Sequence, residues 1–309
     1  MKYSIVFPGQ GSQSIGMLSD LSSNFSIVSE IFQEASDALG VDLWKIAQED
    51  QEALNLTENT QPIMLASGYA TYKVLSNEVK LSPVCMAGHS LGEYTALVAS
   101  KSLNFFDAVK LVRRRAELMQ SAVPKGSGSM AAVLGLDDAK VIEICAQSSS
   151  YGVVEAVNFN SPGQVVIAGE KEAVIKACDE MKEAGAKRAL VLPVSVPSHC
   201  SLMTDAAEEF KTSVDTVNFQ LGNVRVIHNV DADYARDVEE IKSKLVEQLH
   251  KPVLWTSSVQ KMKKSGVERL IEVGPGKVLA GLTRRIDKSL SGSAIIDVAT
   301  LKSTIEELS

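Results

Sequence analysis

The sequence predicts an α/β fold, in which a core built on a mainly parallel sheet carries an inserted ferredoxin-like βαββαβ subdomain. Two patterns lead to this prediction. Short apolar runs end in glycine-bounded turns before helical patterns, an alternation typical of a parallel, helix-covered sheet. One central stretch has the element order βαββαβ, which is the split motif of ferredoxin-like domains.

Four segments are expected to form strands of the core sheet: residues 3–7, 83–87, 224–230 and 269–273. The first ends in the turn at residues 8–11 (PGQG), and the last ends at residues 274–276 (GPG). Helical patterns occupy residues 62–76 and 277–286, and another helix is expected to begin near Leu91. The core therefore belongs to the α/β class.

The stretch at residues 125–195 is expected to fold as the small subdomain. Its expected strands are residues 130–134, 153–158, 164–168 and 188–194, with helices at 137–147 and 171–184. Glycines and serines at residues 126–129 mark its beginning, and Pro193 and Pro197 mark its end. The predicted organisation is a large catalytic domain of residues 1–124 and 196–309 around a subdomain of residues 125–195.

Composition and charge exclude several classes of function. The chain has 309 residues, 45% of them apolar and 22% charged, which describes a globular protein with a sizeable core. Its net charge is −7 and it has no block of five like charges, so we expect neither nucleic-acid binding nor a polybasic membrane anchor. The first 13 residues lack the pattern of a signal peptide and no apolar run reaches 18 residues, so a cytoplasmic protein without a membrane partner is expected.

The four cysteines are far apart in the sequence and form no C-x-x-C pair. This spacing favours neither a zinc site nor a disulfide framework. Buried thiols are expected instead, because cysteine is among the most frequently buried residue types.

The strongest chemical signal is the pentapeptide GHSLG at residues 88–92, between an expected strand and an expected helix. This context is typical of a nucleophile elbow, in which flanking glycines allow the sharp turn that exposes a serine hydroxyl. Ser90 would be the nucleophile, and the backbone N–H of Leu91 would face a developing oxyanion at the helix N-terminus. The alternative is a chance occurrence of the pattern in a glycine-rich turn, which the strand and helix context disfavours.

A serine nucleophile needs a base, and the chain has only four histidines. His89 lies inside the elbow and is not expected to reach back to its neighbour. His228 falls within an expected strand, and His250 falls at a polar helix end. His199 follows an expected strand at residues 190–196, at the turn where an open α/β sheet would present catalytic groups. His199 is therefore the favoured base, and a structural role for it stays open at this point.

An arginine falls on the apolar face of the helix expected at residues 107–121. At 100° per residue, Arg115 shares an arc with five apolar side chains, whereas Arg113 and Arg114 lie outside it. A buried guanidinium keeps its charge and needs acceptors. Arg115 either extends its charged end to the surface, or is paired internally, or is a fork for the carboxylate of a substrate, bound through two parallel hydrogen bonds.

Six segments together resemble one enzyme family over nearly the whole chain: residues 7–13 (FPGQGSQ), 88–94 (GHSLGEY), 120–124 (QSAVP), 158–164 (NFNSPGQ), 196–199 (VPSH) and 272–276 (EVGPG). In order and spacing they are similar to the bacterial malonyl-CoA:acyl carrier protein transacylases. The resemblance implies a hydrolase-like α/β core with a ferredoxin-like insert, in agreement with the organisation above.

The resemblance also implies roles for six residues. They are Ser90 as nucleophile, His199 as base, Arg115 as ligand of the malonyl carboxylate, Gln10 and Leu91 as backbone donors of the oxyanion hole, and Gln248 as the backbone carbonyl that orients the histidine. The family has no acidic third member of a serine triad, so none is expected here.

The implied reaction is ping-pong transfer of malonyl from malonyl-CoA to the phosphopantetheine thiol of an acidic acyl carrier protein, for fatty-acid elongation. No metal or cofactor is expected, and a monomer is expected because every proposed catalytic group lies on one chain. The carrier protein would dock on local cations, for which the candidates are Lys187, Arg188, Lys261, Lys263, Lys264, Arg284 and Arg285.

Three alternatives to this function remain at this point. A free-standing acyltransferase of a polyketide synthase would use the same residues. A serine esterase would share the elbow but would not require Arg115. A nucleotide-binding role could rest on Gly9-Gln10-Gly11, but Ser14 stands where a dinucleotide fingerprint has glycine.

Overall fold

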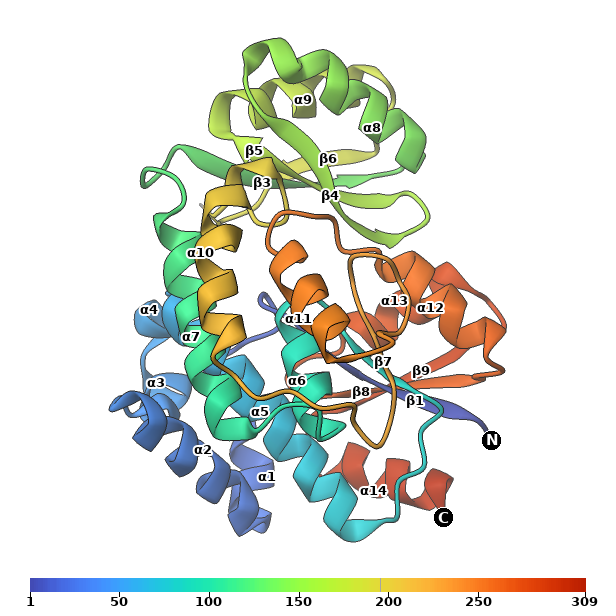
Figure 1. The fold of residues 1–309 in the computed structure, drawn as a ribbon. Coiled ribbons are helices and arrows are strands. Elements are labelled where there is room, and N and C mark those ends of the chain that lie inside the picture. The colour runs from blue at the N-terminus through green and yellow to red at the C-terminus, as the bar shows by residue number, and fades with distance from the viewer. Residues whose placement is uncertain (195) are drawn as a thin grey trace.

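A five-stranded parallel sheet forms the centre of the larger part of the molecule (Figure 1). The computed structural model describes residues 1–194 and 196–309. Every neighbouring pair of strands runs parallel, in the order β7-β2-β1-β8-β9. The strands are β1 (Tyr3–Phe7), β2 (Met86–Gly88), β7 (Val226–Ile227), β8 (Arg269–Val273) and β9 (Ser291–Ile295).

Successive side chains of the central strands enter two different apolar cores. Ile5 and Phe7 of β1 pack into the larger core, whereas Val6 between them packs with Trp255 on the other face. This alternation follows from the two-residue period of a strand, and it explains why three successive residues of β1, Ile5, Val6 and Phe7, are apolar. Both faces of the sheet are therefore covered.

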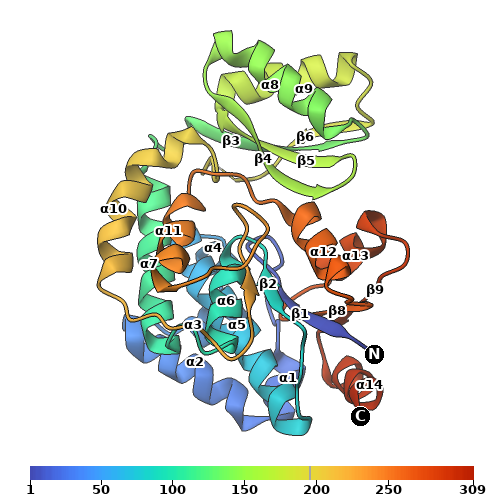
Figure 2. The ribbon, with the colours of Figure 1, turned by 45° about the vertical axis from the view of Figure 1, so that its right-hand side comes forward.

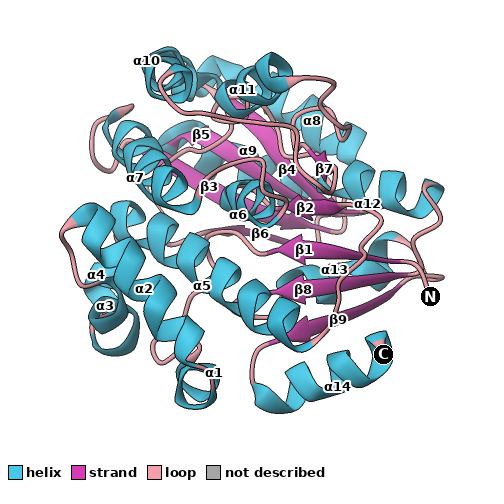
Figure 3. Ribbon diagram, turned by 60° about the horizontal axis from the view of Figure 1, so that its bottom comes forward, coloured by secondary structure: helices cyan, strands magenta, loops and turns pink. Residues whose placement is uncertain are grey.

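Helices on the two faces supply these cores. The larger core includes residues of α2 (Ser26–Leu39), α5 (Thr57–Glu78), α6 (Leu91–Ala99), α7 (Phe105–Ser121) and α10 (Thr204–Asp215), and the other core includes residues of α12 (Trp255–Lys264) and α13 (Val278–Ile286). The remaining helices here are α1 (Ser19–Asn24), α3 (Leu43–Glu49), α4 (Gln51–Leu54), α11 (Val238–Glu247) and α14 (Val298–Leu308), and α14 lies along the edge strand β9 (Figure 3). Within the described ranges, no helix is both long and apolar enough to span a membrane.

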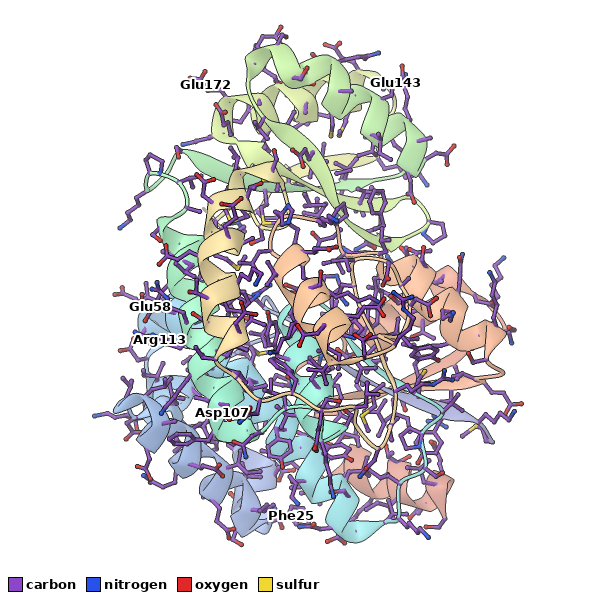
Figure 4. All side chains as sticks on the ribbon, viewed as in Figure 1. Phe25, Glu58, Asp107, Arg113, Glu143 and Glu172 are labelled. Atoms are coloured by element: carbon purple, nitrogen blue, oxygen red, sulfur yellow. The ribbon has the colours of Figure 1, made fainter. Side chains whose placement is uncertain are left out.

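A second sheet of four antiparallel strands lies beside the first (Figure 2). Its strands are β3 (Gly128–Leu134), β4 (Val154–Ser161), β5 (Gln164–Glu170) and β6 (Arg188–Val191), in the order β4-β5-β3-β6. One face packs against α8 (Asp138–Gln147) and α9 (Lys171–Glu183) through a separate apolar core. Glu143 and Glu172 lie on the outer surface of these two helices (Figure 4).

The predicted fold class is confirmed, with a parallel sheet in the core and a βαββαβ unit of ferredoxin-like strand order between its elements. The strand bounds predicted for residues 3–7 and 269–273 match β1 and β8. The domain limits at residues 125 and 195 stay predictions, and residue 195 lies outside the described residues.

Three predicted strands are wrong in extent. The strand expected at residues 83–87 is the shorter β2, which begins at Met86 and ends at Gly88. A strand is expected at residues 188–194, and the segment before His199 is expected to stay extended to residue 196. In the structure this strand is β6, which ends at Val191. Pro193 has no N–H with which to extend the ladder. The strand expected at residues 224–230 is reduced to β7, and His228 lies just beyond it, where its N–H bonds to Asp233 within a turn.

Candidate active site

The carboxyl ends of three neighbouring strands bring distant segments of the chain together. β1 leads to Gln10, β2 leads to Ser90, and β7 leads to Asn229. Because these strands are adjacent and parallel, the loops after them meet at one edge of the sheet. A hydrogen bond of 2.7 Å from the N–H of Ser90 to Oδ1 of Asn229 joins two of these loops.

The turn at Ser90 is sharp and strained. Ser90 has φ 50° and ψ −109°, a conformation that L-residues rarely adopt. A Cβ added at Gly88 would lie 1.8 Å from the carbonyl carbon of Gly92, and one added at Gly92 would lie 2.2 Å from the carbonyl oxygen of Phe7. The pentapeptide therefore needs both glycines to close the turn against β1.

The serine hydroxyl lies within hydrogen-bond distance of a histidine. Oγ of Ser90 is 2.8 Å from Nε2 of His199, and Nδ1 of His199 is 2.6 Å from the backbone carbonyl of Gln248. A carbonyl oxygen can only accept, so Nδ1 carries the proton and Nε2 presents its lone pair to the hydroxyl. Gln248 caps the C-terminus of α11, and the N–H of His199 bonds to the next carbonyl, that of Leu249, at 3.0 Å.

His199 comes from the loop between β6 and α10, so its expected position at the end of a core-sheet strand is wrong. The preceding strand, β6, belongs to the antiparallel sheet. The contact with the two carbonyls after α11 holds the histidine instead.

Burial keeps His199 neutral. Burial is the largest cause and the nearby Arg115 charge is the second; against the opposing effect of the Gln248 carbonyl, they lower the pKa of the imidazole to about 3. A neutral imidazole is the form that can accept a proton from serine. The site therefore holds its base in the competent state well below neutral pH.

We expect the pH profile of acylation to lack the fall in kcat/KM near pH 6.5 that protonation of an ordinary histidine would cause. With the pKa of His199 lowered to about 3, kcat/KM should stay level as pH falls through 6.5. The measurement is kcat/KM from about pH 5 to about pH 8, with a malonyl thioester of a thiol that carries no titrating phosphate. A tenfold fall per pH unit beginning near 6.5 would contradict the neutral histidine.

The same shift predicts how stability depends on pH. The folded-state pKa of His199 lies below its unfolded value of 6.5, so protonation favours the unfolded chain. The contribution of this group to stability is therefore full above about pH 6.5 and declines as pH falls toward 3. A thermal unfolding curve at each pH separates this loss of fold from loss of catalysis.

Arg115 points into the same site from α7. Its side chain is 1% exposed; one terminal nitrogen donates to Oε1 of Gln61 at 2.8 Å, and the other donates to Oε1 of Gln248 at 3.0 Å and to Oγ of Ser90 at 3.2 Å. Its Nε has no acceptor among the described residues. These three acceptors are uncharged amide and hydroxyl oxygens, so they do not neutralise the positive charge of the guanidinium. The guanidinium fork can therefore bind the carboxylate of a substrate.

The two arginines before Arg115 behave differently. Arg113 projects from α7 toward Glu58 on α5 (Figure 4) and forms ion pairs with Glu58 at 3.7 Å and with Glu117 at 2.8 Å. Arg114 pairs with Glu209 on α10. The division predicted from the helical wheel, with Arg115 inside the apolar arc and its neighbours outside, is confirmed.

Two backbone N–H groups lie in the turns near the serine. Leu91 is the first residue of α6, and Gln10 lies in the turn after β1. Neither N–H has a hydrogen-bond acceptor within residues 1–194 and 196–309. The turns are close, since a Cβ on Gly9 would lie 2.4 Å from the carbonyl oxygen of His89. Such free donors suit an oxyanion hole.

The other two histidines beside the site have their own partners. Nε2 of His89 is 2.8 Å from Oδ1 of Asn160, and its ring lies 5.7 Å from that of Trp255. Nδ1 of His228 is 2.8 Å from Glu93, which agrees with a structural role. His250 lies just past the end of α11.

Three polar residues that the sequence patterns did not single out complete the site: Gln61, Glu93 and Asn229. All three side chains are almost fully buried. Glu93 was detectable in principle, because it stands within LGEYTALVA, an otherwise uncharged segment whose burial would require its carboxylate to be paired. Gln61 and Asn229 carry no comparable signal.

The fold and the site define an α/β acyltransferase with an elbow serine. The model of the acyl transferase domain family matches residues 4–303, and the chain belongs to this family. The chain is 52% identical to the malonyl CoA-acyl carrier protein transacylase of Haemophilus influenzae and 50% identical to that of Salmonella typhimurium, with 99% of each chain covered.

Solved structures agree with these relatives. An acyl carrier protein S-malonyltransferase from Vibrio cholerae superposes with a TM-score of 0.96 at 51% identity, over 98% of this chain and 100% of that one. A malonyl-transacylase in complex with its type II PKS acyl-carrier protein superposes with a TM-score of 0.98 at 47% identity, over 99% and 100% of the two chains.

Proposed function

We propose that the protein transfers malonyl from malonyl-CoA to the phosphopantetheine thiol of an acyl carrier protein through an ester on Ser90, and so supplies fatty-acid elongation. One observation carries the assignment: His199 and Arg115 both contact the hydroxyl of Ser90, at 2.8 Å and 3.2 Å. A base and a carboxylate-binding fork thus meet at one nucleophile. The names of the relatives at about 50% identity support the same substrate and acceptor.

In the first half-reaction, Nε2 of His199 takes the proton as Oγ of Ser90 attacks the thioester carbonyl. The N–H groups of Gln10 and Leu91 hold the oxyanion of the tetrahedral intermediate. The intermediate collapses by breaking the carbon–sulfur bond, and the imidazolium returns the proton to the leaving thiol of coenzyme A. The backbone carbonyl of Gln248 keeps the imidazole in the required tautomer.

In the second half-reaction, the thiol of the carrier protein enters the same site and gives its proton to His199. The sulfur attacks the ester carbonyl, the same two N–H groups hold the oxyanion, and Ser90 leaves with the proton from the imidazolium. Arg115 keeps the malonyl carboxylate in place through both halves, so the ester stays in one pose between them.

A transferase and an esterase differ in the acceptor of the malonyl group, which is the carrier thiol in one case and water in the other. We expect that malonyl released from the enzyme appears on the carrier thiol much faster than it appears as free malonate, which is measured by following both products from labelled malonyl-CoA. Equal release with and without carrier protein would favour the serine esterase alternative.

A polyketide carrier protein is the second candidate acceptor. The similarity at TM-score 0.98 to a malonyl-transacylase bound to a type II PKS acyl-carrier protein favours retaining it. Comparison of kcat/KM for the two kinds of carrier protein decides between them.

An exposed basic pair on α13 is the candidate docking site that we favour for the acidic carrier protein. Arg284 and Arg285 lie in the last turn of the helix. Within the described residues neither forms an ion pair, and Arg285 reaches the small subdomain by donating to Oε1 of Gln164 at 3.2 Å. By contrast, Lys261 among the other candidates is held by Asp233 at 2.8 Å.

Reversing the charge of this pair should weaken the second half-reaction alone. We expect R284E/R285E to raise the apparent KM for carrier protein about tenfold and to leave KM for malonyl-CoA unchanged. The matched control is K80E/K302E, which changes the net charge equally at two exposed lysines after α5 and on α14. Equal effects of the α13 variant on both substrates would refute the docking role.

A further inference from the structure

Glu93 is a charged residue inside the core, and neither of the two half-reactions described above uses it. It lies in the first turn of α6 and is 0% exposed. An ionised carboxylate loses several kcal/mol of hydration on burial unless it is paired and hydrogen-bonded. Such a group is retained where its bonds fix something that an apolar residue could not fix.

Three donors surround this carboxylate, each at 2.8 Å. One oxygen bonds to Nδ1 of His228, and the other accepts from the backbone N–H of Asn229 and from Nε2 of Gln248. The last two groups can only donate, so the shared oxygen must be an acceptor. The Glu93 carboxylate therefore decides which end of the Gln248 amide faces it.

The other end of the Gln248 amide faces Arg115. Oε1 of Gln248 accepts from the arginine at 3.0 Å, while Nε2 faces Glu93 and also the carbonyl oxygen of Ser90 at 3.2 Å. If the amide rotated by 180°, its NH₂ would meet the N–H donors of Arg115 and its oxygen would meet Glu93. Such an arrangement places donor against donor and acceptor against acceptor.

We propose that Glu93 is a positioning residue for the malonyl-binding fork: it fixes the Gln248 side chain, which in turn sets the direction of Arg115 beside Ser90. The proposal rests on the carboxylate-binding role of Arg115 in the proposed function. It assigns to the Gln248 side chain a task separate from that of its backbone carbonyl, which faces His199. Selectivity for a carboxylated acyl group then depends on a residue that never touches the substrate.

The test compares malonyl and acetyl thioesters, because only the malonyl group uses the fork. The rate of acyl-Ser90 formation is followed by intact mass for both. In Glu93→Gln the amide oxygen can take the place of the shared acceptor but without its charge. The malonyl-to-acetyl ratio of rates should fall about tenfold, the size expected for weakening a charge-assisted hydrogen bond.

A second variant removes the Gln248 side-chain amide between Glu93 and Arg115 and leaves Glu93 itself unchanged. Gln248→Met removes the amide and leaves the backbone carbonyl that faces His199, so the ratio should fall at least as far. Asn229→Ala is the matched control, because it keeps the backbone N–H that faces Glu93. It removes the side-chain bonds to the N–H of Ser90 and to the carbonyl of Gly88, both at 2.7 Å, and from Gln248 only a long contact of 3.4 Å, so the Gln248 bonds to Glu93 and Arg115 stay in place. That variant should slow both acyl groups equally and leave the ratio unchanged.

An unchanged ratio in both Glu93→Gln and Gln248→Met would overturn the proposal and leave Glu93 a structural anchor. An equal loss with both thioesters would do the same. If Glu93→Gln does not fold, as shown by its unfolding curve, Gln248→Met alone decides. Failure of the proposed function is a separate outcome, since the unsubstituted protein would then form no malonyl-Ser90 at all.

Discussion

Ser90→Ala should abolish malonyl transfer, with a fall in kcat on the order of 10⁴-fold or more. Without Oγ there is no atom to carry the acyl group between coenzyme A and the carrier thiol, and the base has no proton to take. The rate of malonyl-carrier formation measures the effect, and intact mass should show no adduct on the variant.

The variant should keep its fold, which makes it a sharp test. Oγ of Ser90 bonds only to His199 and Arg115 within the described residues, so its removal breaks no contact outside the site. A thermal unfolding curve close to that of the unsubstituted protein is the control. Transfer at more than about a hundredth of the original rate would show that the acyl group is not carried on this serine.

Arg115→Ala should lose malonyl transfer and gain relative activity toward uncharged acyl groups. Removal of one partner from a buried, hydrogen-bonded charge pair costs about 2–5 kcal/mol, which corresponds to roughly 30- to 5,000-fold in kcat/KM. Acetyl transfer should not suffer this loss, because acetyl has no carboxylate for the fork. The measurement is kcat/KM for malonyl-CoA and acetyl-CoA with the same carrier protein.

Two further variants make the interpretation specific. Arg115→Lys keeps a charge but not the planar fork, so it should recover only part of the malonyl rate. Arg113→Ala removes a surface arginine two residues away, paired with Glu58 and Glu117, and should change kcat/KM by no more than about twofold. Unchanged malonyl transfer in Arg115→Ala would show that the carboxylate binds elsewhere.

The elements with strong local patterns were predictable from the sequence. β1 and β8 are short, mostly apolar segments that end in glycine turns, and their predicted bounds match the structure. β9 was missed because Ser291–Ile295 is a partly exposed edge strand of small residues with no apolar run. β7 is only two residues long, because the chain turns soon after it and brings the N–H of His228 to the carbonyl of Asp233.

The candidate site was predictable where one segment carries the signal. The pentapeptide GHSLG predicts Ser90 as the nucleophile, and the helical wheel places Arg115 inside the apolar arc. The contacts that orient these groups join residues far apart in the sequence, such as Gln61 with Arg115 and Glu93 with Gln248. Their partners depend on how α5, α6, α7 and α11 pack, and no local pattern encodes that packing.

The acyl-enzyme is the central claim, and mass spectrometry tests it directly. The protein is exposed briefly to malonyl-CoA, its intact mass is measured, the modified peptide is mapped, and phosphopantetheinylated carrier protein is then added. We predict a malonyl adduct on Ser90 that disappears onto the carrier thiol. No adduct, an adduct on another residue, or one lost to water at the same rate with or without carrier protein would contradict the account.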